Sequence, residues 1–335
     1  MLNILCLIFL TLPPFIPENQ EEPIVIEGLT MGTTYRIIYF DEPRRRDFKY
    51  SVDSLLALIN KSISTYDAAS EISRFNQSSQ GITFQLPFFK QALKKSAEIY
   101  KASNGAFDPT VMPLINAWGF GPGKSFHLPQ AKVDSLKALV GFNKVGLSED
   151  GISKSDPRIQ LDMGGIGQGF GADVIFHFLK NKGIVDMLVE LGGEGLASGK
   201  NLAKEKPWRI GILNPNSTPD NQFFKAYVTL CNEAFTTSGN YFNYRIIDGK
   251  KVGHTLDPVS GFPVRNELLS VSLFTNDCTT ADGWATAFMV MGLQKTMAQL
   301  KLMPEIDALL IYSSPKGKMK TYITPGIKRL IILEK

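Results

Sequence analysis

The feature that most constrains the fold of this chain is its many short strand-like runs. Two longer amphipathic segments lie among them. Residues 47–63 and 88–102 carry apolar side chains at helical spacing, so each predicts a helix with one buried face. The strand-like runs are rich in β-branched and aromatic residues and cover residues 24–26, 34–40, 187–191, 208–212, 225–230 and 268–274. Turn residues around 28–32 predict that the first two runs form a hairpin. We therefore predict an α+β or mixed α/β fold with a largely antiparallel sheet.

The first fifteen residues, MLNILCLIFLTLPPF, contain an apolar run of about a dozen residues. The run is too short to span a bilayer and resembles the core of a signal peptide, although no Lys or Arg precedes it and no small-residue cleavage site follows. Lipidation at Cys6 and a misassigned start are the alternatives. We predict a signal peptide or membrane anchor with its linker at 1–22 and one globular domain at 23–335.

Charge and cysteine content exclude several classes of partner. The net charge is +4, but the basic residues are scattered, and the only dense run, residues 44–46, lies in a polar segment. We interpret it as solvated surface and predict no nucleic-acid binding. The three cysteines show no CxxC spacing, so a zinc site or a disulfide framework is not expected.

The segment TTADGWATA predicts a helix that begins near Thr280 or Ala281 and carries Asp282 and Thr286 on one face. A magnesium ion takes oxygen ligands and commonly only one or two carboxylates, so this pair and a loop carbonyl would suit it. The alternative is a plain helix start, where Asp282 complements the helix dipole and Thr286 bonds back to a carbonyl of its own helix. Spacing alone leaves both interpretations open.

Two loops offer further chemistry. In GHTLDPVSGFP, His254 and Asp257 flank a turn rich in Pro and Gly, which presents either an oriented acid–base group or a structural histidine. Residues 161–173 contain a glycine-rich stretch whose backbone could approach phosphate or metal. It matches neither a Walker A motif nor a dinucleotide fingerprint. The aromatic and glycine residues of 104–122 fit a flat-ring pocket and a packed turn equally well.

Eight segments together resemble one family. In chain order they are MGTTYRI, STYDAASEISRFN, GAFDPTVMPLINAWGFGP, LDMGGIGQGFGAD, LVELGGEG, TSGNYFNY, GHTLDPVSGFP and TTADGWATAFMVMG. This order resembles the ApbE family of FAD:protein FMN transferases, from about residue 27 to the end of the chain. The resemblance implies a T-fold-like architecture with its active-site cleft between two lobes, the glycine-rich loop and the Thr280 helix lying on either side of it.

The resemblance also implies a reaction. The family cleaves FAD with Mg²⁺, passes FMN to a Ser or Thr hydroxyl of an acceptor protein and releases AMP. The alternatives are a pyrophosphatase that hydrolyses FAD to FMN and AMP, and a lipoprotein that binds FAD without turnover. The N-terminal apolar run predicts an exported, periplasmic protein, either free or anchored to the inner membrane. The family suggests a membrane redox-complex subunit as acceptor.

Carried over residue by residue, the resemblance assigns three groups of residues. Asp282, Thr286 and the Gly165 carbonyl would bind the metal. His254, with Asp257 beside it, would act in transfer. The residues expected to bind the flavin dinucleotide are Met31, Tyr66, Ala106, Phe107, Asp108, Asp162, Gln168 and Leu256. Gln168 stands where the family commonly has Lys, and a neutral amide supplies no charge to a phosphate, so weaker FAD affinity is expected.

Overall fold

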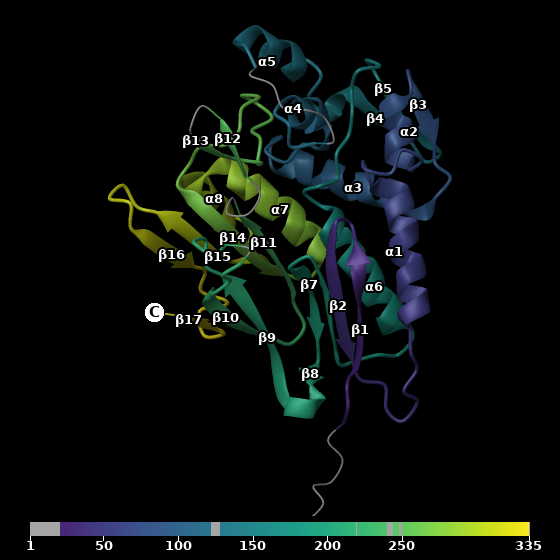
Figure 1. Ribbon diagram of the computed structural model, residues 1–335, viewed down its shortest axis with the longest axis vertical. Coiled ribbons are helices and arrows are strands. Elements are labelled where there is room, and N and C mark those ends of the chain that lie inside the picture. Colours follow the sequence, from purple (N-terminus) through teal and green to yellow (C-terminus); the bar gives the residue numbers. More distant parts are fainter. Residues whose placement is uncertain (1–20, 122–127, 219, 240–243, 248–249, 335) are drawn as a thin grey trace, which may run out of the picture.

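The fold is built on an eight-stranded sheet in which every neighbouring pair is antiparallel (Figure 1). The computed structural model describes residues 21–121, 128–218, 220–239, 244–247 and 250–334. In spatial order the strands are β1 (Ile24–Thr30), β2 (Thr33–Tyr39), β6 (Met187–Leu191), β7 (Glu194–Ser198), β11 (Ala234–Gly239), β14 (Leu268–Thr275), β15 (Asp307–Ser313) and β16 (Met319–Ile323). The antiparallel sheet predicted from the sequence is confirmed.

Helices cover one face of this sheet. They are α1 (Lys49–Ile63), α6 (Gly167–Asn181), α7 (Cys278–Met291) and α8 (Leu293–Leu300). Helix α3 (Pro87–Ala102) packs against α1 and α7, and the short α2 (Glu71–Gln77) lies beside α1. Alternate strand residues such as Ile37, Val189 and Leu273 point into the core beneath the helices. The amphipathic segments predicted at 47–63 and 88–102 correspond to α1 and α3.

A smaller antiparallel sheet covers the opposite face. Its order is β17 (Ile331–Leu333), β10 (Phe224–Leu230), β9 (Lys206–Leu213) and β8 (Lys200–Asn201), the last followed by the 3₁₀ turn η3 (Leu202–Lys204). Ala226 and Val228 of β10 pack there against Phe274 and Leu309 of the main sheet. The sheet is therefore buried on both faces at β14 and β15, which explains why these two strands read as nearly continuous apolar runs, whereas β1 and β2 alternate between buried and more exposed residues.

The remaining elements lie around one end of the helical layer. They are the strands β3 (Gly81–Thr83), β4 (Val145–Leu147) and β5 (Gly151–Lys154), the hairpin β12 (Tyr244–Ile247) and β13 (Lys250–Gly253), the helices α4 (Met112–Ala117) and α5 (Gln130–Lys137), and the turns η1 (Pro109–Val111) and η2 (Phe142–Lys144). Leu114, Trp118, Val133, Val140 and Leu256 form a separate small core at this end. The small core supports one side of the pocket described below.

Two local features differ from the sequence expectation. Helix α7 begins at Cys278, two residues earlier than predicted, because Asp277 caps it by accepting a hydrogen bond from Thr280 N at 2.9 Å. Helix α6 begins at Gly167, inside the glycine-rich stretch that we interpreted as a loop. Glycine at 169 is required there because a Cβ would lie 2.4 Å from the Cys278 carbonyl oxygen. The glycines thus allow α6 and α7 to pack closely.

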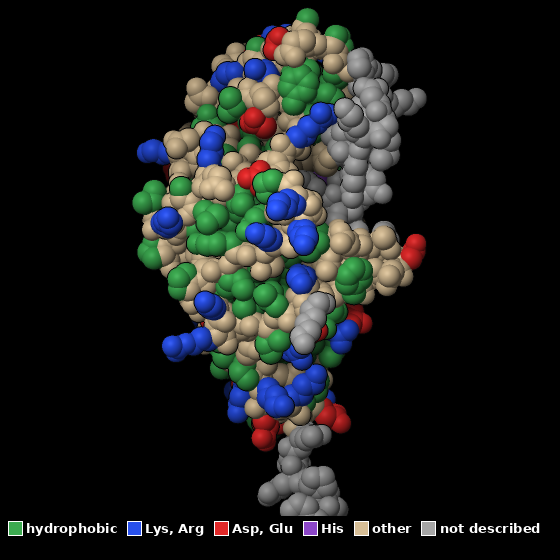
Figure 2. All heavy atoms as spheres, turned by 90° about the vertical axis from the view of Figure 1, so that its left-hand side faces the viewer, with side chains coloured by type: hydrophobic (Ala, Val, Ile, Leu, Met, Phe, Trp, Pro, Cys, Tyr) green, Lys and Arg blue, Asp and Glu red, His purple; other side chains and the backbone are tan. Residues whose placement is uncertain are grey.

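Surface charge agrees with the sequence interpretation. On the face shown in Figure 2, Lys and Arg side chains are spread from top to bottom with apolar side chains between them. In the dense basic run, Arg45 pairs with Glu42 and Arg46 with Asp41, both at 2.7 Å. Within the described part of the chain, no helix is long and apolar enough to cross a membrane. The predicted signal or anchor segment, except for residues 21 and 22, lies outside the described residues.

Candidate active site

An open pocket of about 410 Å³ lies between the small core and the helices α6 and α7. Its lining includes most of the residues singled out from the sequence, namely Tyr66, Ala106, Phe107, Asp108, Asp162, Gly165, Gln168, His254, Leu256, Asp282 and Thr286. These residues come from five separate segments of the chain. The fold therefore brings them together as expected, with the exceptions of Met31 and Asp257.

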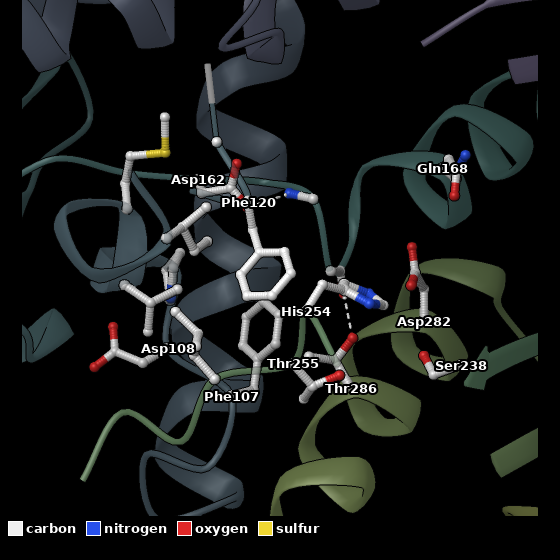
Figure 3. Close-up of a pocket in the computed structure, with 18 of the residues that line it drawn as sticks. Phe107, Asp108, Phe120, Asp162, Gln168, Ser238, His254, Thr255, Asp282 and Thr286 are labelled. Atoms are coloured by element: carbon white, nitrogen blue, oxygen red, sulfur yellow. Dashed lines mark hydrogen bonds between the residues drawn. The ribbon is translucent and has the colours of Figure 1, made fainter. Parts of the chain in front are cut away.

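Asp282 and Thr286 face the loop that precedes α6 (Figure 3). The Thr286 hydroxyl donates to the Gly165 carbonyl oxygen at 3.4 Å, and Asp282 Oδ2 accepts from Gly169 N at 3.0 Å. Neither contact fits the plain helix start that we held open. Asp277 caps α7 instead of Asp282, and Thr286 bonds to the neighbouring loop rather than to its own helix.

The Asp282 carboxylate is deeply buried, with only 3% of the residue exposed. Burial raises its pKa to about 7, although the amide of Gly169 favours the charged form and the charge of Asp173 opposes it. The Asp173 carboxylate already has hydrogen-bond partners at the start of α7: it accepts from the backbone amides of Cys278 and Thr279 at 2.9 and 2.8 Å. A bound cation would offset the cost of charging Asp282 in this environment.

The donors at this point suit magnesium. Asp282, Thr286 and the Gly165 carbonyl offer only oxygen atoms, and the pocket beside them leaves room for water and a substrate phosphate. Among the residues that the structure describes, no group of three or more His, Cys, Asp or Glu side chains could hold a metal. A cation here would therefore rest on one carboxylate and neutral oxygens. The metal-ligand role itself stays a prediction.

His254 enters the pocket from a folded-back loop that the small core supports. Asp257 N donates to Phe262 O at 2.9 Å, and Trp118 Nε1 donates to Gly261 O at 2.9 Å, which fixes the loop against α4. The His254 ring lies edge-on to Phe120, with their centroids 6.5 Å apart. The sequence expectation of an oriented histidine thus has a structural basis.

Asp257 is placed differently from our expectation. Its Oδ1 accepts from Val259 N at 2.9 Å, and the residue is not part of the pocket lining. The carboxylate thereby stabilises the turn that presents His254, as Asp side chains commonly do in such turns. A direct part in catalysis stays a prediction.

The wall opposite α7 carries an aromatic ring and two carboxylates (Figure 3). Asp108 accepts from the backbone amide and the hydroxyl of Thr110, at 2.8 and 2.6 Å, while burial raises its pKa to about 6. Burial also raises the pKa of Asp162, which accepts from Gly164 N at 2.8 Å. Phe107 is 4% exposed, and its ring lies between Asp108 and the side of the pocket that carries His254 and Thr286 (Figure 3). This wall can pack against a flat ring and hydrogen-bond to its polar edge.

Of the other five expected cofactor residues, Ala106 and Leu256 line the pocket, and the remaining three differ in position. Tyr66 is 77% exposed at the pocket, where a ring could cover a ligand. Gln168 lies in the first turn of α6, and its amide would be 2.5 Å from a Cβ at Gly192. Met31 lies in the β1–β2 turn with φ +51° and packs against Gly171, outside the pocket lining. Its expected contact with the cofactor is not supported by this position.

Sequence reasoning missed several residues that line the same pocket. Glu194, Thr237 and Ser238 approach it from β7 and β11. Phe120, from the aromatic segment that left a flat-ring pocket open, also lines it. Glu194 is buried, at 7% exposed. The sequence did contain a sign of Glu194: a carboxylate directly follows the Gly192–Gly193 turn and begins the run EGLAS, whose other residues are small or apolar. Nothing in the sequence marked the hydroxyls of Thr237 and Ser238 as pocket residues, because Thr and Ser are common in strands.

The fold and the pocket define a class of protein: a mixed helix and antiparallel-sheet protein whose ligand-sized pocket carries a single-carboxylate oxygen site. Comparison with known proteins identifies it further. A model of the ApbE family matches residues 31–310. The chain belongs to the ApbE family.

Individual relatives agree over nearly the whole chain. The FAD:protein FMN transferase of Vibrio cholerae is 35% identical, with 93% of each chain covered, and that of Escherichia coli K12 is 31% identical, with 95% of this chain and 92% of the relative covered. The solved structure of the flavin transferase ApbE from Vibrio cholerae superposes with a TM-score of 0.83 at 33% identity, covering 92% of this chain and 99% of that one. The apo flavinyl transferase ApbE of Pseudomonas stutzeri gives 0.81 at 32% identity, covering 92% and 96%.

Proposed function

We propose that this protein transfers FMN from FAD to a Ser or Thr hydroxyl of an acceptor protein, in a reaction that requires Mg²⁺ and releases AMP. The observation that carries the proposal is the convergence of five chain segments on one pocket that combines His254, the Asp282 site and the Phe107 wall. Relatives at 31–35% identity carry the name FAD:protein FMN transferase. The pocket volume of about 410 Å³ lies in the usual range for ligand sites.

The reaction exchanges one phosphorus–oxygen bond for another. The acceptor oxygen bonds to the phosphorus of the FMN half, and the bond from that phosphorus to the oxygen retained by AMP breaks. The acceptor hydroxyl loses its proton, and we assign His254 as the base that receives it. The imidazole suits this part because the Asp257 turn and the Trp118 contact hold its loop in place.

The remaining residues bind and orient the substrate. Phe107 and Phe120 provide the apolar surface for the flavin, and Asp108 and Asp162 its polar partners. Asp282, Thr286 and the Gly165 carbonyl would hold Mg²⁺, which when bound would neutralise the diphosphate and the charge that develops on AMP. Gln168 contributes hydrogen bonding without positive charge.

We further propose that the enzyme acts after export, in the periplasm or at the inner membrane, on a membrane redox-complex subunit. The apolar run of residues 1–15 supports export.

One experiment separates the possible activities. The protein is incubated with FAD, Mg²⁺ and an acceptor that bears a Ser or Thr flavinylation motif. We expect a covalent, fluorescent flavin on the acceptor and an equal amount of AMP. AMP without labelled acceptor would instead indicate FAD hydrolysis, and bound FAD without either product would indicate a binding protein. Either of the last two outcomes would contradict the proposal.

A further inference from the structure

Glu194 is a buried carboxylate in the candidate site that lacks a full set of partners. It begins β7, directly after the turn of Gly192 and Gly193, and it is 7% exposed while still lining the pocket. Its Oε2 has no hydrogen-bond partner among the described residues. A buried charge without a partner is costly, so such an atom indicates a ligand that the protein chain does not supply.

A buried hydroxyl lies beside Glu194. Strands β7 and β11 are antiparallel with Phe235 opposite Gly195, so the next position in the register sets Thr236 opposite Glu194. The Thr236 hydroxyl is buried, and its contact with the Glu194 carboxylate favours the charged form. Oε2 of Glu194 stays without a partner in the described chain, so a bound water is the expected partner of this oxygen.

The charges around Glu194 point to a cation. The Asp282 carboxylate lies close enough to Glu194 for their two negative charges to repel each other. The described lining of the pocket holds four carboxylates, on Asp108, Asp162, Glu194 and Asp282, but no Lys or Arg. A diphosphate would be repelled from these walls unless cations accompany it.

We propose that Glu194 is a positioning residue for the pocket's divalent cation, whose hydrated form it holds by accepting a hydrogen bond from a cation-bound water. Glu194 is then not one of the direct oxygen ligands but supplies the second negative charge beside Asp282. Thr236 binds the same water network. This inference rests on the proposed magnesium dependence. It adds β7, which carries none of the predicted metal ligands, to the elements that form the cation site.

The test measures cation binding to the full-length protein without FAD. Mn²⁺ and Mg²⁺ titrations by calorimetry, with Mn²⁺ electron paramagnetic resonance as a second readout, give the affinity of wild type, Glu194→Gln and Glu190→Gln. Glutamine keeps the shape of glutamate and removes the charge. Glu190 lies on the same hairpin and accepts from Gly193 N, but it does not line the pocket. It is therefore a matched control for the lost charge.

We expect Glu194→Gln to weaken cation binding by about 10- to 100-fold, the usual effect of losing a group that supports metal ligands. Glu190→Gln is expected to stay within about twofold of wild type, because its charge lies outside the pocket lining. Thermal unfolding in a chelator should show Glu194→Gln as stable as wild type or more so, since a buried unpaired charge is removed. A merely structural carboxylate would instead lower that unfolding temperature and leave the affinity unchanged.

The outcomes separate this inference from the proposed function. If wild type labels the acceptor and binds the cation, and Glu194→Gln binds it equally well, the role of Glu194 is wrong while FMN transfer stands. If wild type binds neither Mn²⁺ nor Mg²⁺, both the role of Glu194 and the proposed magnesium dependence are wrong. Labelling of the acceptor by wild type in the presence of a chelator would confirm that flavin transfer does not depend on magnesium.

Discussion

Asp282 shows how one residue can serve both the fold and the site. Its carboxylate accepts from Gly169 N at the start of α6, and it also faces the pocket beside Thr286. The first contact alone would suit an asparagine, because an amide oxygen accepts equally well. The negative charge, which is costly in this buried position, is needed only if a cation is bound.

This argument predicts the behaviour of two substitutions at 282. Asp282→Ala should abolish Mg²⁺-dependent turnover, and Asp282→Asn should reduce it by at least about 100-fold while keeping the bond from Gly169 N. The measurement is flavin transfer as a function of Mg²⁺ concentration. Asp277→Asn, which removes a charge from the same helix but keeps the cap, should retain activity. Full activity of Asp282→Ala would rule out the metal assignment.

Asp108 predicts a pH dependence of stability. Its pKa is about 6 in the folded protein and near 3.8 when unfolded, so between these values the folded state holds more protons. Asp108 should therefore lower the free energy of unfolding as pH rises from about 4 to 6, by roughly 3 kcal/mol at most. Urea unfolding of the metal- and FAD-free protein across this range measures the slope. Other buried carboxyls with raised pKa values, such as Asp162 and Asp282, contribute to the same fall, so Asp108→Asn should reduce the slope by the share of Asp108 alone.

The control for Asp108 is an aspartate with the opposite shift. The pKa of Asp156 is lowered to about 2 by its contact with Arg158, so this carboxyl stays charged in the folded protein across the same range. Asp156→Asn should leave the fall in stability between pH 4 and 6 in place. Equal slopes in wild type and Asp108→Asn would contradict the assignment of the effect to Asp108.

Helices α6 and α7 are the elements that form the cation site. Gly169 lets them approach, because a Cβ there would lie 2.4 Å from Cys278 O and 2.8 Å from Asp282 Cβ. Gly169→Ala should therefore force the helices apart, lower stability by roughly 1–3 kcal/mol and weaken Mg²⁺ binding. Calorimetric cation titration and urea unfolding measure the two effects.

The same helix supplies a control. A Cβ at Gly167 would meet only Ile63 Cδ1 at 3.5 Å, an ordinary contact, so Gly167→Ala should be neutral or slightly stabilising. If both alanine variants behaved alike, the close approach of the two helices would not be what places Asp282.

Elements and individual contacts differed in how far the sequence predicted them. Residues 187–191 and 88–102 were predicted almost to the residue, because their apolar periodicity reflects one buried face. The start of α6 was missed because a helix that contains three glycines contradicts local propensity. The packing against α7, which lies more than a hundred residues later in the chain, explains Gly169, whereas Gly171 lies against Leu191 and Met31.

For the whole molecule, the sequence predicted which segments form the pocket better than it predicted what each residue in the pocket does. Most of its motifs lie next to the end of a strand or helix, whereas Asp282 and Thr286 lie within α7, and all of the motifs except MGTTYRI line one pocket. Glu194 was missed because its meaning depends on which atoms remain unpaired after folding. The part of Asp257 in catalysis stays a prediction, because a turn carboxylate and an acid–base carboxylate look alike in a sequence.

The whole-molecule prediction concerns the N-terminal segment. Strand β1 begins at Ile24, and the described contacts of the preceding residues are exposed ones between Glu22 and Arg45. Because exposed ion pairs contribute little, a chain that starts at Pro23 should unfold within about 2 °C of the full-length protein and transfer FMN at the same rate to a soluble acceptor. Only its association with membranes should be lost.

A longer truncation provides the comparison. A chain that starts at Thr33 lacks β1, whose Ile26 is 2% exposed and whose seven residues pair with β2. Removing this strand uncovers Tyr35 and the edge of β2, so the unfolding temperature should fall by roughly 5 °C or more. Thermal unfolding of both truncated proteins, followed by circular dichroism, measures the difference. If the chain from Pro23 were also destabilised or inactive, residues 1–22 would belong to the folded domain, and the predicted boundary at 23 would be wrong.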